Sequence, residues 1–290
     1  MNLIDEARAL TLYDAMRDKT QQSGGSAANS AYGLAALGGS AAFAGQVCRD
    51  AVGDAFIADL VAGGVSFVGQ QKEGGLATAR SMIFVTPDGV RSMNTYLGTS
   101  LNLTANHIPA DTGASVIYLE GYLFDAPEGP EIFKKAAEIA QQSDAQLALS
   151  LSDPWCVERH REQFSAFIRE HVSILFSNEE EVTTLTGSDR IAAQQEMSAQ
   201  LDELIITQGA DGAVVCCEDA QVSVPAMPEG AVIDTTGAGD LFAAGYLYGR
   251  ATGASALQSA ELASLCAGEV ICHYGARPAK PIAAFIEQAV

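Results

Sequence analysis

The chain has 290 residues, of which 48% are hydrophobic and 18% are charged, a composition that predicts a buried core and excludes global disorder. Acidic residues outnumber basic ones by 36 to 16, and the net charge of −20 argues against nucleic acid or an anionic membrane as a partner. No apolar run reaches the ~18 residues of a membrane span, and the first residues lack the features of a secretory signal. We therefore expect a cytoplasmic protein.

The first third of the chain predicts two helices, over residues 5–19 and 27–37, separated by a break rich in glycine and serine. The second helix consists of small residues, which allow its backbone to approach a sheet or a ligand closely. Short strands follow at 41–46, 66–70, 76–86 and 90–96, and Pro87-Asp88-Gly89 signals a hairpin turn between the last two. We expect these strands to form a small accessory sheet, mainly from residues 66–96.

From residue 115 onward, strands and helices alternate. Strands are predicted at 116–120, 146–151, 172–176, 204–207, 213–217 and 232–234. Helices are predicted at 131–142, 159–170, 179–186, 192–201, 239–249 and 254–272. Alternation with short connections predicts an α/β fold with a mainly parallel sheet covered by helices on both faces. We expect one domain over residues 1–290, from which the small β sheet protrudes.

The most informative local pattern is Asp234-Thr235-Thr236-Gly237-Ala238-Gly239-Asp240, between a predicted strand and an apolar helix. A helix that begins there presents free N–H groups to an anion, and the glycines leave room for it. A carboxylate at Asp240 beside such an anion site suits a base that takes a proton from an attacking hydroxyl. Alternatively, Asp240 only offsets the helix dipole. The pattern fits neither a dinucleotide fingerprint nor a Walker loop.

Two further patterns have a structural and a functional explanation. Gly24-Gly25, followed by Asn29, is a turn before a helix, and Asn29 offers a donor and an acceptor suited to sugar hydroxyls. Asn178 and Glu181 share a helix face, either as a helix cap with an acidic first turn or as support for a hydrated Mg²⁺ ion. Both explanations stay open for both patterns.

Together these patterns resemble the PfkB carbohydrate kinase family, over essentially the whole chain. The pattern at 234–240 followed by Leu241-Phe242-Ala243-Ala244-Gly245 is similar to its carboxyl-terminal signature, and residues 24–54 are similar to its amino-terminal signature. Asn178–Glu181 and the turn at 207–212 match its N-x-x-E and T-x-G-x-x-G elements. The resemblance implies a ribokinase-like three-layer sandwich with a small β lid, and transfer of the γ-phosphoryl of ATP to a primary hydroxyl of a sugar or nucleoside.

The resemblance also implies the roles of individual residues. Asp240 would be the general base, and the amides of Gly237, Ala238 and Gly239 would form the anion hole. The acceptor would be bound by Gly25 and Asn29, with Arg91 reaching from the lid to the transferred phosphate. The ATP side would use Asn178, Thr207, Gly209 and Gly212; Glu181 would order Mg²⁺ through water, and Asp234, with Gly275 closing its loop, would bind a monovalent cation such as K⁺.

One departure from the family pattern concerns the amino end. Family members begin with a strand reading roughly G-N-x-x-x-D, and Asp5 does not occupy the place of that aspartate. We expect the 290-residue chain to lack this strand and to be less stable and less active than an extended form.

The resemblance leaves the acceptor and the assembly open. Residues 120–123 and 149–155 look more like the adenosine-kinase branch, so adenosine or another furanose-bearing compound is favoured. Phe84, Met93 and Tyr96 offer either a shelf for a base or part of a core. The alternative to a kinase is a catalytically weak nucleotide- or sugar-binding regulator on the same fold. A homodimer is compatible with the family.

Overall fold

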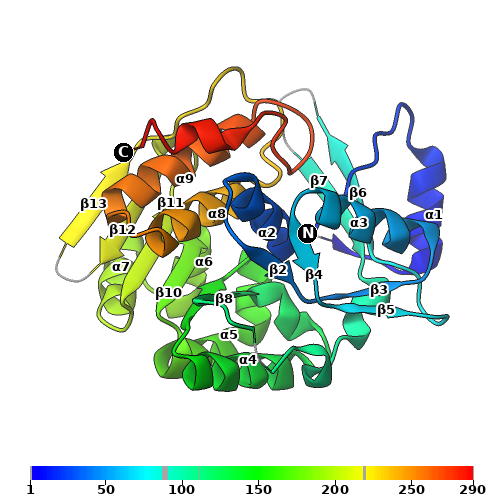
Figure 1. The fold of residues 1–290 in the computed structure, drawn as a ribbon, viewed down its shortest axis with the longest axis horizontal. Helices are drawn as coiled ribbons and strands as arrows, with labels where there is room; N and C mark the ends of the chain where they lie inside the picture. The colour runs from blue at the N-terminus through cyan, green and yellow to red at the C-terminus, as the bar shows by residue number, and fades with distance from the viewer. Residues whose placement is uncertain (1, 87–90, 111, 218–219, 290) are drawn as a thin grey trace.

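A computed structural model describes residues 2–86, 91–110, 112–217 and 220–289 (Figure 1). Its largest sheet has six strands. From one edge to the other these are β13 (Ala220–Val224), β12 (Ala213–Cys217), β11 (Glu203–Thr207), β10 (Ile174–Asn178), β9 (Gln146–Ser150) and β8 (Val116–Glu120). Strands β8 to β11 are parallel, whereas β12 and β13 are antiparallel to their neighbours. The sheet is therefore mixed, and its parallel part aligns the carboxyl ends of four strands.

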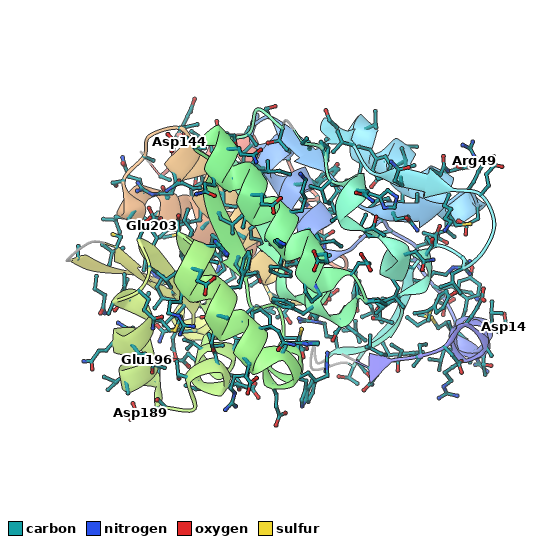
Figure 2. The ribbon with its side chains drawn as sticks, turned by 90° about the horizontal axis from the view of Figure 1, so that it is seen from below. Asp14, Arg49, Asp144, Asp189, Glu196 and Glu203 are labelled. Atoms are coloured by element: carbon teal, nitrogen blue, oxygen red, sulfur yellow. The ribbon has the colours of Figure 1, made fainter. Side chains whose placement is uncertain are left out.

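Alternate side chains of each strand enter different cores. In β9, Leu147 and Leu149 pack on one face of the sheet, whereas Ala148 packs on the other. Figure 2 looks onto the first face, which is covered by α4 (Gly129–Ser143), α5 (Pro154–His171), α6 (Glu179–Thr186) and α7 (Arg190–Ser198). The second face is covered by α2 (Ser26–Ala36), α8 (Ala238–Ala251) and α9 (Ala256–Val270). The predicted ribokinase-like three-layer α/β fold is confirmed.

Helices α2 and α8 pack at very short range because α2 is built from small residues. A Cβ added to Gly33 would lie 2.7 Å from Leu241 Cδ1 and 2.8 Å from Ala244 Cβ. Contacts this short would force the neighbouring side chains to shift, so glycine allows the helices to cross this closely. The carboxyl-terminal half of α2 is thereby held against the amino-terminal half of α8.

The amino-terminal third forms a second, smaller region. We define the small sheet as β1 (Asn2–Leu3), β7 (Arg91–Tyr96) and β6 (Arg80–Val85), in this order. Helix α1 (Glu6–Ala15) covers it, and Ala9, Met82 and Tyr96 form its core. The predicted turn at 87–89 lies outside the described residues. Two parallel pairs, β2 (Ala41–Phe43) with β4 (Val65–Phe67) and β3 (Gln46–Cys48) with β5 (Gln70–Lys72), join it to the main body.

Several elements differ from the sequence-based expectation. Residues 232–234 are not a strand: the amides of Ile233 and Asp234 both donate to the Ile271 carbonyl, at 2.8 and 3.3 Å, instead of joining a sheet. Helix α3 (Ala51–Ala62) was not predicted, although Asp50 caps it by accepting from the Gly53 amide. Strand β13 was also not predicted.

Short 3₁₀ helices complete the described elements: η1 (Gly98–Asn102), η2 (Ala105–His107), η3 (Gly121–Asp125), η4 (Gly209–Asp211) and η5 (Ile282–Phe285). Among the helices that the structure describes, none is long and apolar enough to cross a bilayer.

Candidate active site

A large cavity opens at the carboxyl ends of the parallel strands, where α8 begins. Its volume is about 2850 Å³, well above the ~300–1000 Å³ of a pocket for one small ligand, so two reactants fit in it together. Most of the predicted site residues line this one cavity: Gly25, Asn29, Arg91, Asn178, Glu181, Thr207, Gly209, Asp234, Gly237, Ala238, Gly239 and Asp240. The topology thus brings together five segments that are far apart in the sequence.

The amino end of α8 is open toward the cavity. Gly237 precedes the helix with φ of +83°, and no side chain caps it. A Cβ at Gly237 would lie 2.7 Å from Ala276 Cα, so glycine is required for both conformation and space. The Ala238 amide donates to the Thr235 carbonyl at 3.3 Å, whereas the described residues offer no acceptor to the amides of Gly237 and Gly239. These two amides are available to an anion.

Asp240 lies in the first turn of α8 and faces the cavity. Its Oδ1 accepts from Ser26 Oγ at 2.7 Å, and its Oδ2 accepts from Asn29 Nδ2 at 2.7 Å. Burial raises the pKa of Asp240, and these two donors and the charge of Arg91 partly offset the increase. The amide oxygen of Asn29 is buried and lacks a partner among the described residues, which leaves an acceptor for a ligand hydroxyl.

Arg91 reaches the same point from the small sheet. Its guanidinium donates to Thr235 Oγ1, two residues before Gly237. Phe84 and Met93, on the same hairpin, also line the cavity, whereas Tyr96 is buried in the core of the small sheet. The small sheet therefore contributes Arg91 and apolar side chains, Phe84 and Met93 among them, to the cavity.

Sequence reasoning assigned no role to Glu120, which ends β8 and is only 4% exposed. Its Oε1 lies 2.8 Å from the Tyr118 hydroxyl and 2.5 Å from Ser26 Oγ, and its Oε2 accepts from Ser152 Oγ at 2.5 Å. Ser26 therefore connects the carboxylates of Glu120 and Asp240. The signal in the sequence was an acidic residue at the carboxyl end of a buried strand, where parallel sheets place ligand sites.

Asn178 and Glu181 form a complete capping box at the start of α6. The Glu181 amide donates to Asn178 Oδ1 at 2.8 Å, and the Glu181 carboxylate accepts from the Asn178 amide at 2.9 Å and from its Nδ2 at 2.7 Å. Burial raises the pKa of Glu181 to about 7. The helix-cap explanation is thus realised, and both residues still line the cavity.

Of the three predicted residues in the turn after β11, two line the cavity and one does not. Thr207 donates to the Ser177 carbonyl at 3.3 Å, and Thr207 and Gly209 line the cavity. Gly212 is not among the residues that line it; its φ is +94°, and a Cβ there would meet the Val224 carbonyl oxygen at 2.0 Å. The structure therefore gives Gly212 a role in the close packing of the turn.

Asp234 is buried and held by its own loop. Its Oδ1 accepts from the Thr236 amide at 3.0 Å and from Thr236 Oγ1 at 2.6 Å, and its Oδ2 accepts from the Gly275 amide at 3.2 Å. These bonds fix the loop before α8 to the segment after α9, as predicted for Gly275. Whether a monovalent cation joins them stays a prediction.

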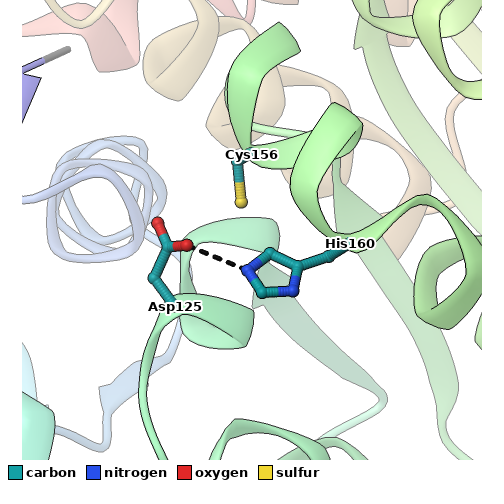
Figure 3. Close-up of side chains that lie close together, drawn as sticks. All are labelled: Asp125, Cys156 and His160. Carbon is teal, nitrogen blue, oxygen red and sulfur yellow. Dashed lines mark hydrogen bonds and ion pairs between the residues drawn. The ribbon is translucent and has the colours of Figure 1, made fainter.

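A separate cluster of Asp125, Cys156 and His160 lies where α5 packs on η3, the 3₁₀ helix that directly follows Glu120 (Figure 3). His160 Nε2 lies 2.9 Å from Asp125 Oδ1, and Arg159 binds both oxygens of Asp125, at 2.7 and 2.9 Å. Cys156 is fully buried, its thiol donates to the Gly121 carbonyl at 3.4 Å, and burial raises its pKa to about 12. A protonated thiol and a carboxylate already paired with Arg159 indicate a structural anchor for η3.

Comparisons with known proteins agree with this geometry. The model of the pfkB family carbohydrate kinases matches residues 6–283. The chain is 41% identical to an adenosine kinase from Sinorhizobium meliloti, with a TM-score of 0.96. The match covers 100% of this chain and 90% of the adenosine kinase. A probable sugar kinase from Rhizobium etli is 42% identical, with a TM-score of 0.95 and coverages of 100% and 89%. An uncharacterized sugar kinase from Archaeoglobus fulgidus is 29% identical over 86% of this chain and 98% of its own length.

Proposed function

Because the chain belongs to the pfkB family of carbohydrate kinases, and so is a sugar or nucleoside kinase that phosphorylates a hydroxyl group, we propose that it transfers the γ-phosphoryl of ATP to the primary hydroxyl of a furanose-bearing nucleoside, with adenosine as first candidate. One observation carries the proposal: the carboxylate of Asp240 shares a cavity with the two free amides at the start of α8.

Asp240 is the general base of this proposal. Its two oxygens are oriented by Ser26 and Asn29, and the cavity gives an acceptor hydroxyl access to it. When the acceptor oxygen attacks the γ-phosphorus, its proton passes to Asp240 and the bond from phosphorus to the ADP oxygen breaks. Because these hydrogen bonds fix the orientation of the Asp240 carboxylate, one of its lone pairs can be directed at the acceptor hydroxyl, as the transfer requires.

The amino end of α8 stabilises the transferred group. The free amides of Gly237 and Gly239 and the dipole of α8 present positive partial charge to the γ-phosphoryl oxygens. Ala238 contributes less, since its amide already donates to Thr235. Arg91, held over this point by Thr235, adds a full charge from the small sheet.

The acceptor is bound between α2 and the small sheet. Gly25 and Asn29 line the cavity beside Asp240, and the unpartnered Asn29 Oδ1 accepts from a hydroxyl of the furanose. Phe84 and Met93 offer an apolar surface to a base. The small sheet then acts as a lid that excludes water, a competing acceptor, from the site.

The nucleotide is bound on the side of β10 and β11. Asn178, Thr207 and Gly209 line this part of the cavity. The donor set suits a hydrated Mg²⁺, because Glu181 presents a buried carboxylate whose oxygens each keep a lone pair beyond those used by Asn178. When bound, this ion neutralises charge on the phosphates. A monovalent cation at Asp234, a homodimer and a cytoplasmic location stay predictions.

A screen of ADP release tests the proposal. The purified chain is offered ATP and Mg²⁺ with adenosine, guanosine, ribose, fructose or no acceptor. We expect adenosine to give the highest kcat/KM, because the apolar surface of Phe84 and Met93 contributes only when a base is present. A preference for a free sugar would refute the nucleoside assignment, and release of ADP with no acceptor above background would refute the water-excluding lid. Absence of turnover with every acceptor would favour the regulator alternative.

A further inference from the structure

The buried carboxylate of Glu120 is held by hydroxyl groups alone. Tyr118, Ser152 and Ser26 surround it at 2.5–2.8 Å, and no ion pair to Glu120 exists among the described residues. A buried carboxylate without a cation is expensive to ionise. Nevertheless, the Ser26 hydroxyl alone bridges the Glu120 carboxylate to that of Asp240, the proposed base.

The hydrogen atoms around Ser26 do not suffice for two ionised carboxylates. Ser26 Oγ lies 2.5 Å from Glu120 Oε1 and 2.7 Å from Asp240 Oδ1, but a serine hydroxyl has one hydrogen and donates once. With both carboxylates ionised, one of these short contacts would set lone pair against lone pair. One additional proton on the pair turns both contacts into hydrogen bonds.

The surroundings place that proton on Glu120. Asp240 accepts from Asn29 Nδ2, lies at the positive end of α8 and faces Arg91, and all three favour its charged form. Glu120 has no such partner, and burial and the charge of Asp240 raise its pKa to about 7. Of the other titratable groups that face this pair, the acids Asp153 before α5 and Glu181 on α6 disfavour a second negative charge, whereas Tyr122 on η3 and Cys156 on α5 are neutral. Tyr118 on β8 acts in the opposite direction, because its hydroxyl donates to Glu120 and favours the charged form.

We propose that Glu120 is a positioning residue that carries the proton shared with Asp240 through Ser26, and that it thereby keeps the base ionised and oriented. The inference rests on the proposed role of Asp240. In the resting state Glu120 donates to Ser26 Oγ, and Ser26 donates to Asp240 Oδ1. During transfer Asp240 takes the acceptor proton and later releases it to water, and Glu120 keeps its own proton throughout.

The first test is the pH profile of kcat. In the parent, Glu120 loses its proton above neutral pH, and the ionised Glu120 then competes with Asp240 for the single hydrogen of Ser26. Because Asp240 loses this donor part of the time, we expect kcat to fall about tenfold over two pH units. Glu120→Gln keeps a donor toward Ser26 at every pH, so we expect this fall to disappear while turnover persists. Tyr118→Phe removes a donor to the charged form of Glu120, which raises its pKa and moves the fall to higher pH.

The second test does not use activity. A carboxyl whose pKa is raised on folding binds its proton more tightly in the folded state, so stability falls as pH rises through the window from its unfolded to its folded pKa. The melting temperature of Glu120→Gln minus that of the parent should therefore be about 5 °C larger at about pH 8 than at about pH 5. A difference that is constant over this range would overturn the proposal, as would a Glu120→Gln profile that keeps the parent's fall.

Asp240→Asn separates the two proposals. If this variant keeps the parent's kcat, the role of Asp240 as base is wrong. If Asp240→Asn loses turnover, but Glu120→Gln keeps the parent's pH profile and its melting temperature differs from the parent's by the same amount at every pH, only the proton on Glu120 is refuted.

Discussion

Two helices of this chain begin beside the same cavity, and their amino ends are treated differently. At α6 the side chains of Asn178 and Glu181 satisfy each other's backbone amides in a closed capping box. At α8, Gly237 provides no cap, and the carboxylate of Asp240 points to Ser26 and Asn29 instead of back to its own helix. The comparison separates a helix start that its own side chains close from one whose first amides stay free of side-chain caps.

The largest expected effect is at the open start. Asp240→Asn removes the proposed base but keeps the size and the amide-compatible contacts of the side chain, so we expect kcat to fall about 10²–10⁴-fold with a normal melting temperature. The measurement is ADP release at saturating acceptor. Asp54→Asn is the matched control, because Asp54 is also in the first turn of a helix, α3, but does not line the cavity. Equal losses in both variants would contradict the role of Asp240.

The open amides can be disturbed through Gly237. A Gly237→Ala change forces an unfavourable φ and a clash with Ala276, so we expect a loss of about 2–4 kcal/mol in stability and a fall in kcat. Gly187→Ala at the carboxyl end of α6 has a similar φ of +73°, but its new Cβ would make only an ordinary contact, 3.8 Å from an Arg161 nitrogen, so this variant should lose only about 1 kcal/mol. Denaturant unfolding and kcat are measured together. A normal kcat in a folded Gly237→Ala protein would remove the anion hole from the mechanism.

The capping box at the start of α6 predicts that the stability of the protein depends on pH. Burial raises the pKa of Glu181 from its usual value to about 7, so the folded state holds this proton more tightly, and its ionisation destabilises the fold as pH rises through that window. We expect Glu181→Gln to be relatively more stable than the parent at about pH 8 than at about pH 5, by up to about 3 kcal/mol. Urea titrations at both pH values measure this, and parallel curves for the two proteins would contradict it.

The smallest effect concerns the cap itself. Asn178→Ala opens the capping box and should destabilise the protein by about 0.5–2 kcal/mol, as should Asp189→Ala at the start of α7. Only the first residue lines the cavity, so only Asn178→Ala should raise the KM for ATP. Similar KM values in both variants would confine Asn178 to a structural role.

Local patterns were sufficient where chemistry and backbone geometry coincide in a few consecutive residues. Residues 234–240 and the box at 178–181 were recognised because each needs specific residue types at fixed spacing. The strand expected at 232–234 is wrong because its apolar residues serve a loop, which the Ile271 carbonyl at the end of α9 holds away from the sheet. No local pattern reports such a distant acceptor.

Contacts that depend on topology were beyond local reasoning. Glu120 has no motif around it, and only the pairing of β8 with β9 and the crossing of α2 over α8 bring it to Ser26. Helix α3 was missed because its composition, rich in alanine and valine, lacks a clear amphipathic period.

The tight crossing at Gly33 has a mechanical consequence. The proposed acceptor-binding residue Asn29 lies on α2 and the proposed base Asp240 lies on α8, and the two helices cross where a Cβ at Gly33 would lie within 3 Å of α8 side chains. We therefore expect α2 and α8 to keep their relative positions when a ligand binds, so that a movement of the small sheet would change access to the site without rearranging Asn29 and Asp240.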